Sequence, residues 1–147
     1  MNWTTSPTEL AAATREWITG ARWFTGDASA DLRFTHANPI ESSENVSTVL
    51  FLVRSGELTF SVPLTFREGP DPREHTSVEP IGTIGDVWIW DASDDVDGQR
   101  ALLSLLTVER ADDAGALRLT SNPVRGQFPA ISSSHRLTSE QSNTSII

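Results

Sequence analysis

The sequence predicts an α+β fold in which an N-terminal helix packs on an antiparallel sheet and a second helix follows. Apolar residues recur at helical spacing near the N-terminus, apolar and polar residues alternate over residues 58–66, and a leucine-rich stretch follows an acidic turn. With 147 residues, including five Trp and six Phe, the chain can bury a sizeable core as one domain, or as one domain with an appendage.

The first helix is expected over residues 7–19. Ser6 can cap its N-terminus, and the Pro-Thr-Glu sequence that follows completes a capping box. Trp17 and Ile18 lie on the apolar face and are expected to point into a core. Gly20 is the expected end of the helix.

Two strands joined by a tight turn are the clearest local structure after this helix. Residues 48–54 form a strand-like run, and Ser55-Gly56 supplies the turn. In residues 58–66 apolar and polar residues alternate, as in a strand with one buried and one solvent-exposed face. Pro63 cannot donate a backbone hydrogen bond, so it is expected at an edge or a bulge.

Shorter patterns predict the remaining elements. A first strand is expected over residues 31–36, another over residues 84–90, a second helix over residues 99–108 and a short strand from residue 117. The apolar face of the second helix is expected to consist of Leu102, Leu103, Leu105 and Leu106. Loops, turns or linkers are expected over residues 38–45, 67–80, 111–115 and 121–134, and a last strand opens at residues 135–137.

The composition excludes several classes of partner. A net charge of −9 argues against non-specific binding to nucleic acid or to an anionic membrane surface. No signal-peptide pattern is present and no stretch approaches the ~20 apolar residues that span a bilayer, so we expect a cytoplasmic protein. Every basic residue is Arg, and the absence of Cys excludes disulfides and thiolate metal sites.

No metal site is predicted from the acidic and histidine residues. Aligning Gly98 with the glycine of a calcium loop puts Ser104 at the final position, which requires Glu. The histidines at positions 36, 75 and 135 lack ligand spacing. We therefore interpret the acidic run as a helix N-terminus favoured by the helix dipole, with the members Asp91, Asp94, Asp95 and Asp97.

The aromatic segment Arg22-Trp23-Phe24 has two interpretations. An Arg stacked on an aromatic ring can form a binding site. The favoured alternative is an anchor at the end of the first helix, which would pack that helix onto the sheet.

The sharpest candidate for chemistry lies near the C-terminus. A phosphate-binding turn needs backbone N–H groups that point one way and side chains small enough for phosphates to approach. Short polar residues meet this requirement and add hydroxyl or amide donors, and they occur here as Gln141, Ser142, Asn143, Thr144 and Ser145. The residues alone leave a phosphate-binding turn and a frayed polar terminus open.

Three segments resemble the N-terminal part of the bacterial maltokinases, which are kinases of the aminoglycoside-phosphotransferase-like superfamily. The segments occur in the same order as in that family. The first is a helix followed by Arg22-Trp23-Phe24-Thr25-Gly26. The second is an aromatic strand leading into Asp91-Ala92, followed by the leucine-rich helix. The third and most specific is Glu140-Gln141-Ser142-Asn143-Thr144-Ser145-Ile146-Ile147.

This resemblance implies a two-part organisation. Residues 1–90 would form a cap subdomain, in which a curved, cystatin-like antiparallel sheet packs on the N-terminal helix. Residues 91–147 would form an intermediate region that leads through a helix into the start of a kinase N-lobe. The Gln141 to Ser145 turn would lie over the ATP phosphates. Such enzymes transfer the γ-phosphoryl group of ATP, with magnesium, to maltose or a related sugar.

No catalytic residue or metal ligand is assigned to this chain. It lacks the phosphate-pairing Lys, the catalytic-loop Asp and Asn, and the metal-binding Asp motif of kinases. We therefore expect a non-catalytic cap region that packs on the remaining kinase lobes and needs no cofactor by itself. The alternative is a free-standing cap-like module that binds a protein of trehalose or glycogen metabolism.

Two further expectations concern single positions. Asp27 stands where the family commonly has Lys, which reverses the charge after the aromatic segment. In an isolated chain, residues after about 138 are expected to fray or to pair with the edge of another chain.

Overall fold

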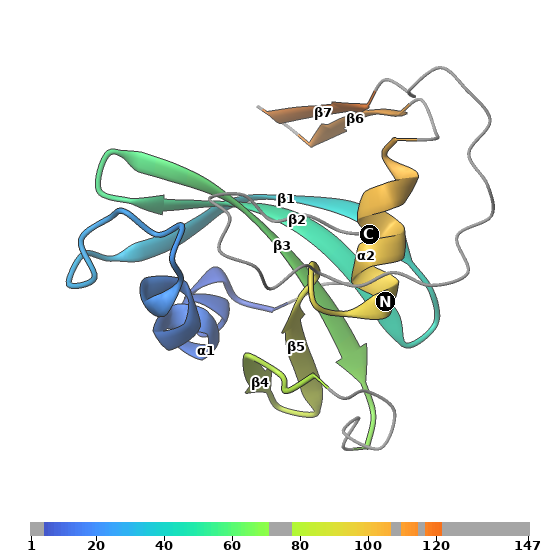
Figure 1. Cartoon of the computed structure of the whole chain (residues 1–147), viewed down its shortest axis with the longest axis horizontal. Coiled ribbons are helices and arrows are strands. Elements are labelled where there is room, and N and C mark those ends of the chain that lie inside the picture. Colours follow the sequence, from blue (N-terminus) through green and yellow to red (C-terminus); the bar gives the residue numbers. More distant parts are fainter. Residues whose placement is uncertain (1–4, 71–77, 107–109, 115–116, 122–147) are drawn as a thin grey trace.

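The computed structural model describes residues 5–70, 78–106, 110–114 and 117–121 (Figure 1). It confirms the predicted α+β fold. In chain order the elements are α1 (Pro7–Gly20), β1 (Leu32–Ser42), β2 (Val46–Ser55), β3 (Leu58–Glu68), β4 (Gly82–Ile84), β5 (Val87–Asp91), α2 (Val96–Ser104), β6 (Arg110–Ala114) and β7 (Leu117–Ser121).

The start of α1 has the expected capping box. The Ser6 hydroxyl accepts a hydrogen bond from the Thr8 N–H at 3.2 Å, and the Glu9 carboxylate accepts one from the Ser6 N–H at 3.3 Å. These contacts satisfy N–H groups that have no partner inside the helix. Ile18 is fully buried, as predicted, and the helix ends within one residue of its expected end.

Five antiparallel strands form one sheet in the order β1-β2-β3-β5-β4. The face that packs on α1 carries the hydrophobic core. Because side chains alternate along each strand, the core residues occupy every second position. The buried members from the helix and the strands are Leu10, Ile18, Leu32, Phe34, Val49, Phe51, Val53, Val62, Leu64, Phe66 and Ile89.

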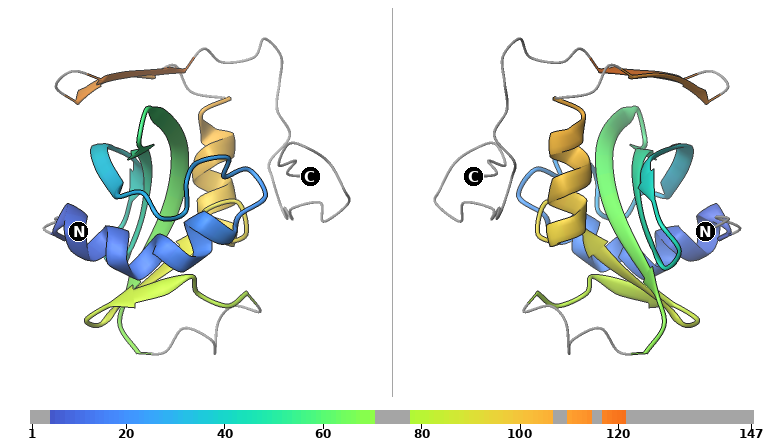
Figure 2. Two further views of the ribbon diagram at one scale, coloured as in Figure 1. Left: turned by 90° about the vertical axis from the view of Figure 1, so that its left-hand side faces the viewer. Right: turned by 90° about the vertical axis from the view of Figure 1, so that its right-hand side faces the viewer.

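The helix α2 lies on the opposite face of the sheet, which we call the back face. Thr65 is flanked by the core residues Leu64 and Phe66, so its side chain points away from α1. Gly98 of α2 lies directly over the Thr65 hydroxyl. Figure 2 shows α2 and the first half of α1 on opposite sides of β2 and β3.

The first strand is longer than predicted, and the loop expected over residues 38–45 is wrong for most of its length. Strand β1 continues to Ser42 because it accommodates two irregularities, between Phe34 and His36 and between Pro39 and Glu41. Bulges of this kind bend a strand without ending it. Pro39 is tolerated because β1 pairs with β2 on one side and has no other pairing strand among the described elements of this sheet.

The β2–β3 hairpin confirms the predicted turn. Gly56 has a φ of +59°, which its lack of a Cβ permits. Pro63 lies where β5 has already ended, since β5 pairs only with residues 64–68 of β3. The Pro63 carbonyl accepts a hydrogen bond from the Ala92 N–H at 3.1 Å. In an antiparallel strand the N and the carbonyl of one residue face the same side, so the Pro63 nitrogen, which has no hydrogen to donate, also faces the space beyond the end of β5. The expected edge position is thus confirmed for this half of β3.

The strand expected over residues 84–90 is confirmed for residues 87–90, but its start is wrong. A turn at Gly85, whose φ is +61°, divides the segment into β4 and β5, which pair with each other. Both indole N–H groups in β5 donate hydrogen bonds. The Trp88 N–H donates to the Gly69 carbonyl at 3.3 Å, and the Trp90 N–H donates to the Val78 carbonyl at 3.0 Å.

The region after the large sheet also differs from expectation. Helix α2 begins three residues earlier than predicted and ends at Ser104. The turn expected over residues 111–115 is wrong, because β6 occupies most of it and pairs antiparallel with β7. The strand expected from residue 117 is confirmed. The linker beyond residue 121, the last strand and the C-terminal segment lie outside the described residues.

Candidate functional site

The acidic run forms the beginning of α2, as interpreted from the sequence. Asp95 is the N-cap, and its Oδ1 accepts hydrogen bonds from the backbone N–H groups of Asp97 at 3.0 Å and Gly98 at 2.9 Å. A carboxylate at this place satisfies free N–H groups and interacts favourably with the helix dipole. Asp91 makes the preceding turn by accepting from the N–H and the hydroxyl of Ser93, both at 2.8 Å.

Arg67 on β3 fastens this helix start to the back face of the sheet. Its Nη2 lies 2.6 Å from an oxygen of Asp95 and 2.8 Å from one of Asp97, and its guanidinium carbon lies 5.6 Å from the centre of the Trp90 ring. The Asp95 side chain is fully buried. Burial by itself lowers the pKa of Arg67, but the hydrogen bonds and charges of Asp95 and then Asp97 outweigh it and raise the pKa above its ordinary value.

The contact between α2 and the sheet is close enough to require glycine. A Cβ on Gly98 would lie 2.5 Å from the Ala92 carbonyl oxygen and 2.5 Å from the Thr65 hydroxyl. The next residue, Gln99, is buried and donates from its amide to the Ser93 carbonyl at 2.8 Å. Small and polar residues therefore form the buried side of α2.

The predicted apolar face of this helix is only partly buried, since Leu102, Leu103 and Leu105 are half-buried and Leu106 is exposed. The buried residues of α2 are Gly98, Gln99 and Ala101, whereas Leu106, just beyond its end, is 43% exposed and Val96 is 51% exposed. The close approach at Gly98 leaves no room there for a side chain, so the leucines do not form the most buried side of the helix. The leucine surface, which we define as the half-buried Leu102, Leu103 and Leu105 with the exposed Leu106, is therefore available for contacts.

The aromatic segment at the end of α1 is an anchor, as favoured from the sequence. The Trp23 ring lies 5.8 Å from Trp17, 6.4 Å from Phe24 and 5.7 Å from Phe60, measured between centres. Such tilted and edge-on pairs add to the stabilisation from burial. Trp23 keeps 37% of its surface exposed and Leu58 keeps 44%, so this end of the molecule also presents an apolar surface.

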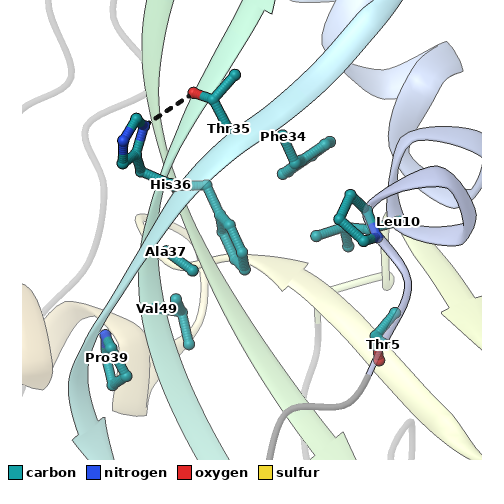
Figure 3. A pocket seen from close by; sticks show the side chains of 10 residues that line it. Thr5, Leu10, Phe34, Thr35, His36, Ala37, Pro39 and Val49 are labelled. Carbon is teal, nitrogen blue, oxygen red and sulfur yellow. Dashed lines mark hydrogen bonds between the residues drawn. The ribbon is translucent and has the colours of Figure 1, made fainter. Parts of the chain in front are cut away.

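A cavity of about 220 Å³ lies beside β1, between that strand and the start of α1 (Figure 3). Leu10, Phe34, Val49 and Phe51 line its interior. His36 bonds to the Thr35 hydroxyl at 3.2 Å rather than to another lining residue. The volume is below the usual size of a small-molecule site, and the lining offers few polar groups to orient a ligand.

A protein-family model, the maltokinase N-terminal cap domain, matches residues 17–95, which is more than half of the chain. The chain belongs to the maltokinase N-terminal cap family. The matched part of this cap domain runs from the second half of α1 to the N-cap of α2. It includes the aromatic anchor, the five-stranded sheet and Arg67. No curated protein is similar enough in sequence to count as a match.

In this cap domain Asp27 has a local structural role. Its Oδ1 accepts hydrogen bonds from the Ser29 hydroxyl at 2.7 Å and the Ser29 N–H at 2.8 Å, and these bonds lower the pKa of Asp27. Arg15 of α1 donates to the carbonyls of Ala28 and Ala30, at 2.8 Å and 3.0 Å. The loop after the aromatic anchor is thus tied to the helix before it.

The residues of the predicted phosphate-binding turn in the intermediate region, Gln141, Ser142, Asn143, Thr144 and Ser145, lie outside the described residues. Within the described part of the chain, no group of three or more His, Cys, Asp or Glu side chains could hold a metal ion. In that same part, no helix is long and apolar enough to cross a membrane.

Sequence reasoning missed the contact of Arg67 with Asp95 and Asp97. The available signal was a charged residue directly after the apolar alternation of β3, together with the acidic helix start. Nothing in the spacing of residues 67 and 95 indicates that they meet, because 28 positions separate them.

Proposed function

We propose that this chain is the non-catalytic cap region of a maltokinase-like sugar kinase. In its complete form the enzyme would transfer the γ-phosphoryl group of ATP, with magnesium, to maltose or a related sugar in the cytoplasm. The family match over residues 17–95 carries the proposal. The chain lacks the phosphate-pairing Lys, the catalytic loop and the metal-binding Asp motif of a kinase, so its proposed contribution is structural.

The leucine surface is the proposed contact with the remaining kinase lobes. Arg67 and Gly98 hold α2 firmly on the sheet, so its exposed residues are presented in a fixed geometry. An exposed apolar surface on a rigid element is typical of a surface that another domain covers. In this arrangement the Gln141 to Ser145 turn would approach the ATP phosphates once the remaining lobe is in place.

A first test measures ATP binding by the isolated chain. Because the proposed site is incomplete, calorimetric titration should give a dissociation constant weaker than about 10 μM, which corresponds to roughly −7 kcal/mol. Tighter binding of ATP, or phosphorylation of maltose by the chain alone, would contradict a non-catalytic cap.

A second test compares two exposed leucines in the complete enzyme. Leu106→Glu changes the leucine surface, whereas Leu58→Glu changes an equally exposed leucine at the tip of the β2–β3 hairpin. We expect only Leu106→Glu to lower the melting temperature and maltose phosphorylation, since a charge there would be buried at the contact with the lobes. Equal effects of both variants would exclude this contact.

The second candidate function is a free-standing module that binds a protein of trehalose or glycogen metabolism. Its support is the exposed apolar surface around Trp23 and Leu58, because Trp is enriched at the centres of protein interfaces. Under this alternative, Leu58→Glu would weaken association with such an enzyme in sedimentation experiments, and Leu106→Glu would not.

A further inference from the structure

The register of β1 and β2 places two arginines directly opposite each other. Arg33 pairs with Arg54, and the next pair along is Phe34 with Val53. Phe34 and Val53 are buried in the core, so both arginines project from the back face, and both are exposed. Directly opposed residues have Cβ atoms about 5 Å apart, which places the two guanidinium groups within reach of one small anion.

The positive charge of this pair is poorly compensated. Arg33 approaches Asp31 only at 3.7 Å, and the side chains of this ion pair are 75% and 84% exposed. Such a pair contributes little in water. The Arg54 side chain forms no hydrogen bond or ion pair with any residue in the described part of the chain. Like charges directly opposite each other destabilise a sheet, so the fold alone does not favour this arrangement.

Hydroxyl groups continue the same surface onto β3. Thr59 pairs with Arg54, and Ser61 follows two residues later on the same face. Both are exposed. Helix α2 contacts Thr65 and Arg67 of the back face, toward the other end of β3, and the surface formed by the arginines and the two hydroxyl residues stays exposed. The tip of the β2–β3 hairpin extends away from α2 (Figure 1).

We propose that Arg33 and Arg54, with the Thr59 hydroxyl, bind the phosphate group of a small phosphorylated molecule. Each guanidinium presents paired N–H donors that match phosphate oxygens. A phosphate monoester carries a charge of about −1.5 to −2 near pH 7 and has three acceptor oxygens, so it can neutralise both arginines and accept from the hydroxyl. A single carboxylate would neutralise only one of them.

Two sources share this chemistry, a phosphorylated sugar and a nucleotide. The selection of these two candidate ligands rests on the proposed function, because a sugar kinase makes a sugar phosphate and ADP. The phosphate site itself does not rest on it. Inorganic phosphate can therefore test the site even if the chain proves not to be part of a kinase.

The test titrates the full 147-residue chain with inorganic phosphate, a hexose phosphate and ADP at constant ionic strength, with chloride as the reference anion. Binding is followed by calorimetry and by the melting temperature, which rises when a ligand binds only the folded state. The variants are Arg33→Gln and Arg54→Gln. The control is Arg22→Gln, which removes an exposed arginine that lies outside the strands of the sheet.

We expect phosphate to stabilise the wild-type chain and Arg22→Gln equally. Arg33→Gln and Arg54→Gln should each weaken phosphate binding by about tenfold or more, which corresponds to the loss of one charge-assisted contact. Without phosphate, Arg54→Gln should melt no lower than the wild type, because the substitution relieves the repulsion. Tighter binding of hexose phosphate or of ADP than of inorganic phosphate would identify the source.

Two results would overturn the proposal. One is equal stabilisation of the wild type and Arg54→Gln by phosphate, which would mean general charge screening. The other is binding of a polyglutamate peptide without binding of any phosphate compound, which would assign the arginine pair to an acidic protein segment instead.

Discussion

At the scale of single residues, Arg67 and Gly98 determine how the second helix sits on the sheet. Arg67 neutralises a fully buried carboxylate that also caps the helix. Gly98 allows the helix backbone to approach Thr65 and Ala92. Electrostatic and steric requirements thus meet within one turn of α2.

Replacing Arg67 by Ala should lower the free energy of unfolding by about 3 kcal/mol, because it leaves the Asp95 carboxylate buried without its partner. Arg100→Ala is the control, since that side chain is 61% exposed and pairs with Oδ1 of Asp97 at the surface. The control should cost less than about 1 kcal/mol. Equal losses for the two variants in urea unfolding would show that the buried pair has no special role.

A second residue-scale prediction concerns Gly98→Ala. The added Cβ would overlap the Ala92 carbonyl oxygen and the Thr65 hydroxyl, so the variant should lose about 1–3 kcal/mol of stability. At Gly20, the last residue of α1, a Cβ meets nothing within 4 Å. Gly20→Ala should therefore be neutral or stabilising by about 0.5 kcal/mol. A Gly98→Ala variant as stable as Gly20→Ala would contradict the close contact.

Asp27 provides a prediction about pH. Hydrogen bonds from Ser29 lower its pKa in the folded state, so its contribution to stability is fully present above the ordinary value of 3.8. That contribution is lost as the pH falls through the lowered folded value. Asp27→Asn should therefore melt below the wild type at pH 7, and the two should converge below pH 3.8. A difference that persists unchanged in acid would exclude the ionised carboxylate as its cause.

At the scale of elements, α2 shows why an amphipathic pattern can mislead. Four nearby leucines suggest a buried stripe, but the most buried residues of this helix are Gly98, Gln99 and Ala101, because the helix lies close against the sheet. Strand β1 makes a similar point. Its Asn-Pro sequence predicts a loop, yet an edge strand with bulges carries both residues.

The orientation of α2 can be tested by two substitutions on opposite sides of the helix. Ala101 is fully buried, so Ala101→Leu should cost about 1–3 kcal/mol through overpacking. Leu106 is 43% exposed, and Leu106→Ser in the isolated chain should change stability by less than about 0.5 kcal/mol. Both effects are measured by thermal unfolding. A larger loss of stability for Leu106→Ser than for Ala101→Leu would support the helix orientation expected from the sequence, with the leucines buried.

At the scale of the whole molecule, the described strands form two separate sheets. The five-stranded sheet is covered by α1 on one face and partly by α2 on the other. The second sheet is a hairpin of only two strands, β6 and β7. Two-stranded sheets are marginal in water by themselves, so the molecule should open in stages.

Native-state hydrogen exchange should resolve these stages. Amides that pair β2 with β3 should exchange only through global unfolding, because the core residues lie on these strands. Amides that pair β6 with β7 should exchange at a clearly lower free energy of opening. Equal protection in both sheets would mean that the hairpin is a full part of the cooperative unit.

The sequence by itself determined the elements whose causes are local. The capping box fixes the start of α1, and strict alternation with a Ser-Gly turn fixes the β2–β3 hairpin, because each signal lies within a few residues of its effect. The aromatic anchor and the acidic start of α2 were predicted for the same reason. These local patterns were sufficient for the α+β fold.

Only the tertiary structure decided which surfaces face each other. The pairing of Arg67 with Asp95, the close approach at Gly98 and the opposition of Arg33 and Arg54 depend on strand register and on the face to which α2 docks. Register and docking are set by the summed packing of the core, which no short stretch of sequence contains. For that reason the partly exposed leucine surface and the arginine pair could be recognised only in the folded molecule.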